Sequence, residues 1–168
     1  IDVRLVGSEM CIRDRGFITR KDGVQTHKLL EKGHEALCSV PHRGGMSAEG
    51  VGDGAGVSVD LSIEFFQKIT NTDLKAGQFG VGNFFMPNRQ EQRDKACQLI
   101  ASSLADSGLK ILAERDIAVD NGVLRSAAID LQLPITQWIF LAPMGISGVK
   151  FEKLIYSVLL AIESQAYT

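Results

Sequence analysis

The side chains best suited to chemistry in this sequence lie in a glycine-rich stretch from His42 to Gly56, which holds six glycines in fifteen residues. Such a stretch cannot bury itself, and its glycines permit backbone conformations with positive φ that other residues resist. A long loop of this kind is usually functional or disordered. Amphipathic segments flank it on both sides, which favours an ordered, functional loop over a plain connector.

Two charged residues of this loop are candidate ligand contacts. Arg43 can bind a carboxylate, or the carbonyl groups of the loop itself, through its planar guanidinium group. Asp53 stands between two glycines and can accept hydrogen bonds from backbone amides. We therefore take Arg43, Gly44, Asp53 and Gly54 as the candidate wall of a substrate site. The alternative, which we favour slightly for both charged residues, is that they only brace the loop.

The other candidate groups are three cysteines and three histidines. Cys11, Cys38 and Cys97 are widely spaced and odd in number, so they predict neither a disulfide framework nor a zinc knuckle, and a reducing cytoplasm is the simplest location. His27 and His34 have no cysteine or acidic partner at zinc-finger spacing, so we predict no metal site. Cys38 and Cys97 fall on or beside apolar helix positions, and we interpret them as core residues rather than nucleophiles.

The composition fits one globular domain or part of a larger one. The 168 residues are 45% hydrophobic, which is sufficient for a core. A net charge of −2 gives no electrostatic reason to expect nucleic acid or an acidic membrane surface as partner. No apolar run approaches the ~18 residues of a membrane span. We therefore expect neither a nucleic-acid partner nor a membrane partner.

The elements next to the glycine-rich loop must position it. Before the loop, a helix is predicted from about 27 to 40, because Thr26 suits an N-cap and Pro41 stops the helix. After the loop, the alternation of apolar residues over 57–61 predicts a strand. A short helix follows from 62 to about 69.

The remaining elements mix strands and helices without a regular βαβ repeat, which indicates an α+β fold. Asp120 is a candidate cap for a short helical turn, and Gly80 and Gly82 suggest that a neighbouring backbone approaches closely. The helices at 27–40 and 149–164 are expected to lie on one sheet formed by all the strands. Further strands are predicted at 16–19, 79–86, 109–119 and 135–141, and a further long helix at 88–105.

Several stretches follow one another in an order that resembles a known family. They are Glu35–Gly44, Gly52–Gly56, Phe65-Phe66, Gly80–Pro87 (GVGNFFMP), Arg115–Asp120 (RDIAVD) and Phe151–Tyr156 (FEKLIY). Together they resemble the amidotransferase domain of the glutamate synthase large chain, from Gly16 to the end of the sequence. The members of this family are class II glutamine amidotransferases with an N-terminal-nucleophile hydrolase fold. The resemblance therefore implies a four-layer αββα sandwich, here incomplete, and L-glutamine as the substrate of the complete domain.

The resemblance also implies a nucleophile that this chain lacks. In the family, an N-terminal cysteine before a Gly-Val-Gly-Phe run attacks the glutamine side chain, and its free α-amine can act as the base. That position falls here on Arg13, which cannot attack. Cys11 is two residues away and not at a terminus, so we assign no catalytic residue. The family's substrate-binding arginine and its oxyanion-hole Asn-Gly pair come later than this chain reaches, so we expect the chain itself to be inactive.

The cofactors implied by the resemblance, flavin mononucleotide (FMN) and an iron–sulfur cluster, belong to other domains of the same polypeptide, and we expect none in this chain. Downstream synthase domains are the expected partners, and ammonia assimilation in the cytoplasm is the expected setting. The alternative is a non-catalytic binding or assembly domain of the same fold, because the run from Met46 to Glu49 departs from the family pattern. A nucleotide-binding loop is disfavoured, because a helix precedes the glycines and no Gly-Lys-Ser/Thr is present.

Residues 1–15 do not fit the family pattern. The run from Ser8 to Arg15 resembles a peptide found at the ends of many unrelated translated assemblies, where adapter sequence has been read through. We therefore predict that residues 1–15 are a non-native or disordered leader, and that residues 16–168 are the N-terminal part of the amidotransferase domain. A natural leader is the alternative.

Overall fold

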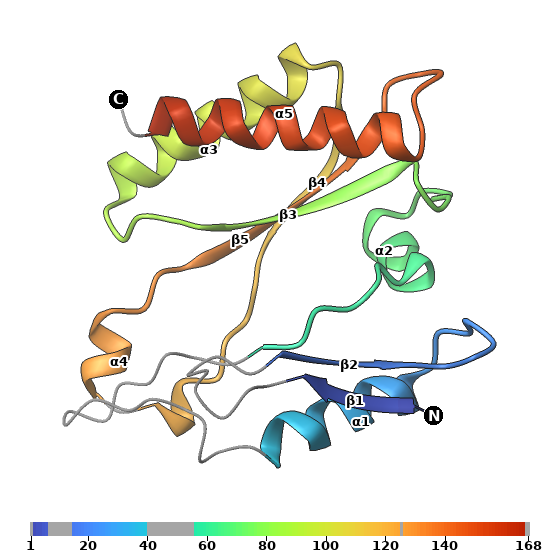
Figure 1. The fold of residues 1–168 in the computed structure, drawn as a ribbon. Helices are drawn as coiled ribbons and strands as arrows, with labels where there is room; N and C mark the ends of the chain where they lie inside the picture. Colours follow the sequence, from blue (N-terminus) through green and yellow to red (C-terminus); the bar gives the residue numbers. More distant parts are fainter. Residues whose placement is uncertain (1, 7–14, 40–55, 125, 167–168) are drawn as a thin grey trace. The chain divides into compact units, whose positions relative to one another are not determined.

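The computed structural model describes residues 2–6, 15–39, 56–124 and 126–166 (Figure 1). The chain divides into two compact units. The first unit comprises residues 1–60 with 123–130, and the second comprises residues 61–122 with 131–168. Helices and strands occur in both units, as predicted for an α+β fold.

The second unit is built on a three-stranded antiparallel sheet in the order β3-β5-β4. Strand β3 spans Phe79–Phe85, β4 spans Lys110–Asp116 and β5 spans Ile135–Leu141. The last strand in sequence is thus the central strand in space, and its five middle residues are all buried. A register shift between Ile111 and Ala113 interrupts the pairing of β4 with β5.

Helices α3 (Gln90–Asp106) and α5 (Val149–Ala166) cover one face of this sheet (Figure 1). Their apolar residues and those of the sheet form the larger core cluster, in which each fully buried Leu, Ile or Phe side chain contributes ~1.5–3 kcal/mol. The fully buried members are Met86, Ile100, Leu104, Leu109, Trp138, Phe140, Phe151, Val158 and Ile162.

The opposite face of the sheet carries a smaller cluster with helix α2 (Ile63–Thr70). Ile139 is completely buried there, and the ring of Phe66 lies 5.8 Å from that of Phe79. The helix begins where the Ser62 side chain accepts a hydrogen bond from the Phe65 amide. Because β-strand side chains alternate between faces, Ile139 faces this cluster while its neighbours Trp138 and Phe140 face α3 and α5.

Gly80 and Gly82 permit close contacts with side chains, rather than with a neighbouring backbone as predicted. A Cβ atom on Gly80 would lie 2.5 Å from Cε2 of Phe140, and one on Gly82 would lie 2.8 Å from Cε2 of Phe84. Both contacts are with aromatic rings. The glycines of β3 therefore make room for the aromatic side chains of the core.

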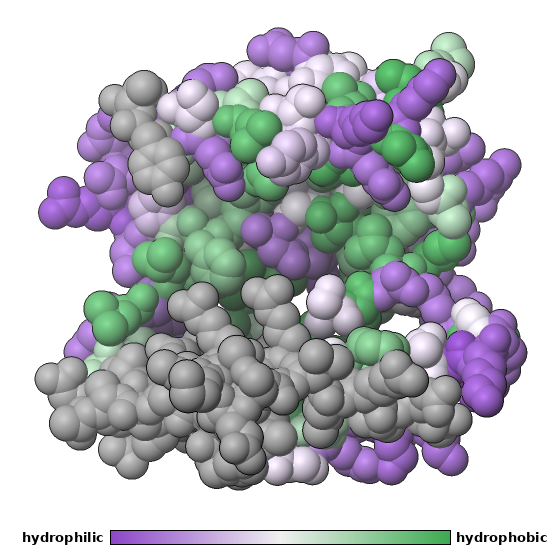
Figure 2. Space-filling view, viewed as in Figure 1, coloured by the Kyte–Doolittle hydropathy of each residue, from purple (hydrophilic) through white to green (hydrophobic). Residues whose placement is uncertain are grey.

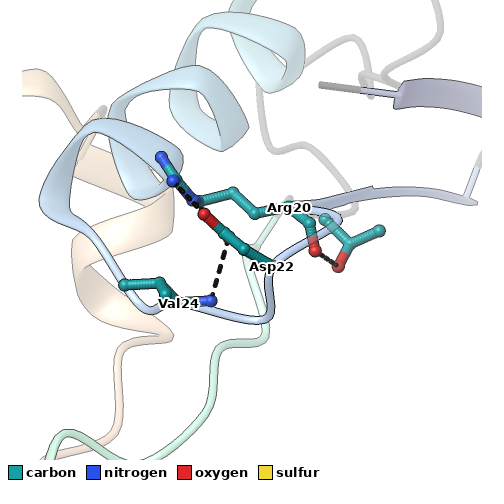
Figure 3. A network of polar contacts seen from close by, with 4 residues as sticks. Arg20, Asp22 and Val24 are labelled. Carbon is teal, nitrogen blue, oxygen red and sulfur yellow. Dashed lines mark hydrogen bonds and ion pairs between the residues drawn. The ribbon is translucent and has the colours of Figure 1, made fainter.

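The first unit contains a two-stranded antiparallel sheet, β1 (Asp2–Val6) with β2 (Arg15–Thr19), and helix α1 (His27–Cys38). Helix α1 has no buried residue. After β2, the chain turns through Gly23, which has a φ of 67°. Figure 3 shows the polar contacts that fix this turn.

In that turn, the Arg20 side chain forms an ion pair with Asp22, and its Nε atom donates a hydrogen bond of 2.8 Å to Asp22 Oδ1. The Val24 amide donates to the same oxygen atom at 3.2 Å. These hydrogen bonds, the one from Arg20 first, hold the pKa of Asp22 well below its usual range. The carboxylate therefore stays charged and closes the turn.

Most predicted elements are present, but two expectations need correction. The residues from 57 to 61 form no strand and are exposed, because alternating apolar side chains do not make a strand without a paired backbone. Two sheets occur in the described parts of the chain, not one. The predicted leader includes the paired strand β1. Its non-native origin stays a prediction. A 3₁₀ turn (Asn121–Val123) follows Asp120 as predicted, whereas helix α4 (Ser126–Asp130) was not predicted.

Candidate functional site

The loop residues proposed from the sequence as a site wall, Arg43, Gly44, Asp53 and Gly54, lie outside the described residues. The same is true of Arg13 at the family's nucleophile position and of Cys11. Their roles therefore stay predictions.

The described flanks of the loop are both in the first unit. On the near side, α1 ends where the Ser39 hydroxyl donates a hydrogen bond of 2.8 Å to the Glu35 carbonyl oxygen. On the far side, the chain returns to α1, since a Cβ atom on Gly33 would lie 3.5 Å from Cγ1 of Val57. The end of α1 and the return of the chain at Val57 therefore define the base of the loop.

Three polar side chains form a hydrogen-bonded row across the sheet of the second unit. It crosses all three strands at one level, because Asn83 on β3 and Arg115 on β4 both pair with Gln137 on β5. Gln137 Nε2 donates a hydrogen bond of 2.9 Å to Asn83 Oδ1. Arg115 Nε donates one of 2.8 Å to Gln137 Oε1. We refer to Asn83, Gln137 and Arg115 as the polar row.

The polar row lies on the sheet face that carries α2. Strand side chains alternate, and Val81, Ala113 and Ile139, each two residues from a member of the row, belong to the cluster around α2. The guanidinium group of Arg115 also lies 5.4 Å from the centre of the Phe65 ring of that helix. This is the distance of a cation–π contact. Helix α2 and strand β5 thus fix Arg115 from two sides.

The face of the sheet that α3 and α5 cover has a separate set of polar contacts. Thr136 is buried there, and its hydroxyl donates a hydrogen bond of 3.2 Å to Asp116 Oδ1. Glu114 accepts a hydrogen bond from the Cys97 thiol at 3.6 Å. The two acidic residues of β4 next to Arg115 therefore engage partners on the other face of the sheet.

The two described cysteines lie in different environments, and only Cys38 departs from its prediction. Cys97 is partly buried, and its burial, followed by the charge of Glu114, raises the pKa of its thiol. The interpretation of Cys97 as a packing residue rather than a nucleophile agrees with this environment. Cys38 is exposed, with Sγ 3.7 Å from His34 Nε2, so its prediction as a core residue is wrong. It lies on the solvent side of α1, which buries no residue.

Within the described ranges, no group of three or more His, Cys, Asp or Glu side chains is placed to hold a metal ion. No helix in the same ranges is long and apolar enough to cross a membrane. A shallow, open depression lies on the outer face of α5, lined by Val149, Glu152, Lys153, Tyr156 and Ser157. On the face that Figure 2 presents, hydrophilic and hydrophobic side chains are mixed over α3 and α5. The depression thus lacks the enclosure typical of a small-molecule site.

Sequence reasoning missed the polar row as a unit. Asn83 and Arg115 lie inside two of the stretches that resemble the family, and Gln137 lies in a predicted strand. The available signal was a polar residue in each strand, Asn83, Arg115 and Gln137, that alternates with apolar ones on the same face. The register that aligns these three residues is set by the pairing of β5 with both neighbours, which the sequence alone does not reveal.

Comparison with known proteins adds to this picture. The family model described as "Glutamine amidotransferases class-II" matches residues 14–168. A glutamate synthase (NADH) of Saccharomyces cerevisiae is 33% identical over 73% of this chain and 6% of its own length. The ferredoxin-dependent glutamate synthase 2 of Synechocystis is 32% identical over 84% of this chain and 9% of its own. The glutamate synthase (NADPH) large chain of Bacillus subtilis is 27% identical over 91% and 10%. The chain thus spans a tenth or less of the length of these relatives.

Proposed function

Because the chain belongs to the class II glutamine amidotransferases, we propose that it is part of the domain that releases ammonia from glutamine in a glutamate synthase. The observation that carries this proposal is the family match over residues 14–168, joined by several glutamate synthases among the relatives. The ammonia would serve the synthesis of glutamate from 2-oxoglutarate elsewhere in the same polypeptide.

In the complete domain, a cysteine thiolate would attack the side-chain amide carbon of glutamine. The C–N bond would break, ammonia would leave with a proton supplied by the protonated base, and a glutamyl thioester would remain. Water would then add to the thioester, giving glutamate and the free thiol. This chemistry needs a free N-terminal cysteine, and the chain has Arg13 at that position. We therefore propose that the 168-residue chain does not turn over glutamine.

The finer fold proposal is the four-layer αββα sandwich. It is supported by the second unit, in which α3 and α5 form one helical layer over one antiparallel sheet. It is also supported by strand β2 and by α1, which contacts β2. In this proposal each unit supplies strands to one of the two sheets and helices to one of the two helical layers.

The partners proposed for the complete protein are L-glutamine and the other synthase domains of the same polypeptide. FMN and the iron–sulfur cluster would be held by those other domains. The relatives' names include NADH, NADPH and ferredoxin as electron donors. A non-catalytic binding or assembly domain of the same fold is the alternative, favoured by the departure of the run from Met46 to Glu49 from the family pattern.

A comparison of four chains tests the proposal. They are the present chain, a chain in which residues 1–15 are replaced by an N-terminal Cys-Gly-Val, a chain extended beyond Thr168 by the parental sequence, and a chain with both changes. Ammonia release from L-glutamine is the measurement. We expect activity only in the chain with both changes, because a thiolate without oxyanion donors and a carboxylate-binding arginine can neither polarise nor hold the substrate.

The control is the doubly changed chain with its N-terminal cysteine replaced by alanine, which should be inactive. Turnover by the present chain that is lost in Cys11→Ala would make Cys11 the nucleophile and contradict our reading of the start. An inactive doubly changed chain that is folded would favour the non-catalytic alternative.

A further inference from the structure

One side of helix α1 carries four side chains that can each bind a metal ion. They recur at spacings of four, three and four residues, so they form one narrow stripe along the helix. The partly buried residues of α1, among them Leu29, Ala36 and Leu37, lie on its other sides. The stripe therefore faces away from the packed side of the helix. Its members are His27, Glu31, His34 and Cys38, and all four are exposed.

His34 and Cys38 lie one helical turn apart, and their metal-binding atoms are close together. His34 Nε2 is 3.7 Å from Cys38 Sγ. In a tetrahedral zinc site, a Zn–N bond of about 2.0–2.1 Å and a Zn–S bond of about 2.3 Å place the two ligand atoms roughly 3.5–3.6 Å apart. The pair already has nearly the separation that a zinc ion requires, and the helix fixes its spacing.

The same contact is a weak hydrogen bond when no metal ion is bound, because a thiol is a poor donor. A bound cation would take the place of the shared hydrogen atom. The Cys38 thiol would then release its proton to water, and the neutral His34 ring would coordinate through Nε2. Thiolate and imidazole are the ligands that zinc prefers in proteins. Little hydrogen-bond energy is therefore lost when these two side chains bind zinc.

The other pair in the stripe has the same geometry but different chemistry. His27 Nε2 lies 3.7 Å from Glu31 Oε1, again four residues apart. The carboxylate is a harder ligand than a thiolate, so a zinc-class cation should favour the pair that contains Cys38. Seven residues, or about 10 Å along the helix, separate His27 from His34, so the two pairs cannot share one ion. His27 is thus a matched control for His34.

We propose that His34 and Cys38 form a two-ligand site for a zinc-class divalent cation, with water in the remaining coordination positions. The sequence predicted no metal site because zinc-finger spacing is missing, whereas this pair depends on the one-turn spacing of helix α1. Two protein ligands are also consistent with the lack of larger ligand groups in the described ranges. The site is separate from the glycine-rich loop, and it does not depend on glutamine hydrolysis.

Titration of the 168-residue chain with cobalt chloride tests this proposal, in a Cys11→Ser background. Co²⁺ occupies zinc sites and, unlike Zn²⁺, reports its ligands, because a bound thiolate gives a charge-transfer band in the near ultraviolet. We expect a saturable band that zinc chloride abolishes by displacing the cobalt. Calorimetry of zinc binding in two buffers of different ionisation enthalpy should show the release of about one proton, from the Cys38 thiol.

Four variants identify the ligands. Cys38→Ser should abolish the band and His34→Ala should weaken cobalt binding at least tenfold. The paired change His34→Lys with Lys28→His keeps composition and charge but moves the imidazole ten residues from Cys38, so it should bind as weakly as His34→Ala. His27→Ala should leave the affinity unchanged. Circular dichroism reports whether each variant keeps its helices.

The proposal is overturned if the chain with Cys38 and His34 intact gives no saturable charge-transfer band, an outcome that needs no further variant. It is also overturned if the paired change binds cobalt as tightly as the parent, because any exposed thiol would then suffice. Equal losses in His27→Ala and His34→Ala would likewise contradict it. Because no turnover is measured, a failure here leaves the glutaminase proposal untouched, and the reverse also holds.

Discussion

At the scale of single residues, Cys38 is exposed, whereas Cys97 is partly buried and packs against the larger core cluster. The assignment of the chain to the glutamate synthase amidotransferases, made from short motifs in order, is confirmed by the comparisons. Cys97 was correctly interpreted as a packing residue, but Cys38 was not, because the periodicity of α1 does not reveal that this helix buries no residue. The polar row depends on strand register, so no single residue could have revealed it.

The two described cysteines should differ in reactivity. In a Cys11→Ser background, we expect Cys38 to react with iodoacetamide at least tenfold faster than Cys97 at pH 8. Cys38 is exposed, whereas burial and the charge of Glu114 raise the pKa of Cys97 and so lower its thiolate fraction. Mass spectrometry of tryptic peptides measures both rates. Glu114→Gln should speed the reaction of Cys97, and equal rates in the parent chain would contradict the assignment.

The turn at Asp22 should make the first unit sensitive to acid. The pKa of Asp22 is lowered on folding, so its contribution to stability is fully present above its unfolded value near 3.9 and is lost as the pH falls through the folded value. Asp22→Asn should therefore be less stable than the parent at pH 7, and the difference should shrink as the pH is lowered below about 4. Hydrogen exchange of the Val24 amide at several pH values measures this. A difference that grows on acidification would contradict the sign.

At the scale of elements, helices were predicted well because their apolar periodicity is local. The predicted helices at 27–40, 62–69, 88–105 and 149–164 match α1, α2, α3 and α5 within two residues. Strands were less certain. The stretch from 57 to 61 alternates as a strand does, yet it forms none, because strand formation depends on a partner elsewhere in the chain.

Two glycine-to-alanine changes test how these elements pack. Gly80→Ala should lower the stability of the second unit by ~1–3 kcal/mol, because the new Cβ would meet the Phe140 ring at 2.5 Å and Cδ1 of Ile155 at 3.0 Å. Gly33→Ala in α1 is the matched control. Its Cβ would make an ordinary 3.5 Å contact with Val57, and helix propensity should raise stability by ~0.5–1 kcal/mol.

Urea unfolding, followed at the Trp138 fluorescence for the second unit and at the α1 amides for the first, measures both changes. A Gly80→Ala variant as stable as the parent would mean that the Phe140 ring moves aside at no cost.

At the scale of the whole molecule, the sequence indicated the α+β class but not the division into two units. The prediction placed all strands in one sheet, whereas the described strands form two, one in each unit. Sequence patterns show which side of an element is apolar, but not which elements share a core. Every fully buried apolar residue among those whose side chains the structure describes belongs to the second unit.

That imbalance predicts unequal stability. The amides of β3, β4 and β5 should exchange with solvent at least tenfold more slowly than those of β2 and α1, because opening the second unit exposes two apolar clusters while α1 buries no residue. Native-state hydrogen exchange followed by nuclear magnetic resonance measures this. On α1, Lys32 Nζ lies 2.5 Å from Glu35 Oε2. This ion pair is not expected to offset the missing apolar burial, since exposed ion pairs contribute ~0–1 kcal/mol to stability. Equal protection across both units would contradict the prediction.

Strand β5 is central in its sheet but last in sequence, so its position affects the order in which the sheet can form during synthesis. Strands β3 and β4 each pair only with β5 in the described sheet, although both precede it in the sequence. On the ribosome, β3, α3 and β4 therefore emerge before the strand that joins them, and their inner edges stay open until residue 141 has left the exit tunnel. At roughly 5–20 residues per second, that interval lasts several seconds. During this time the nascent chain exposes the strand edges and aromatic side chains that chaperones recognise, so slower translation between β4 and β5 should prolong chaperone binding.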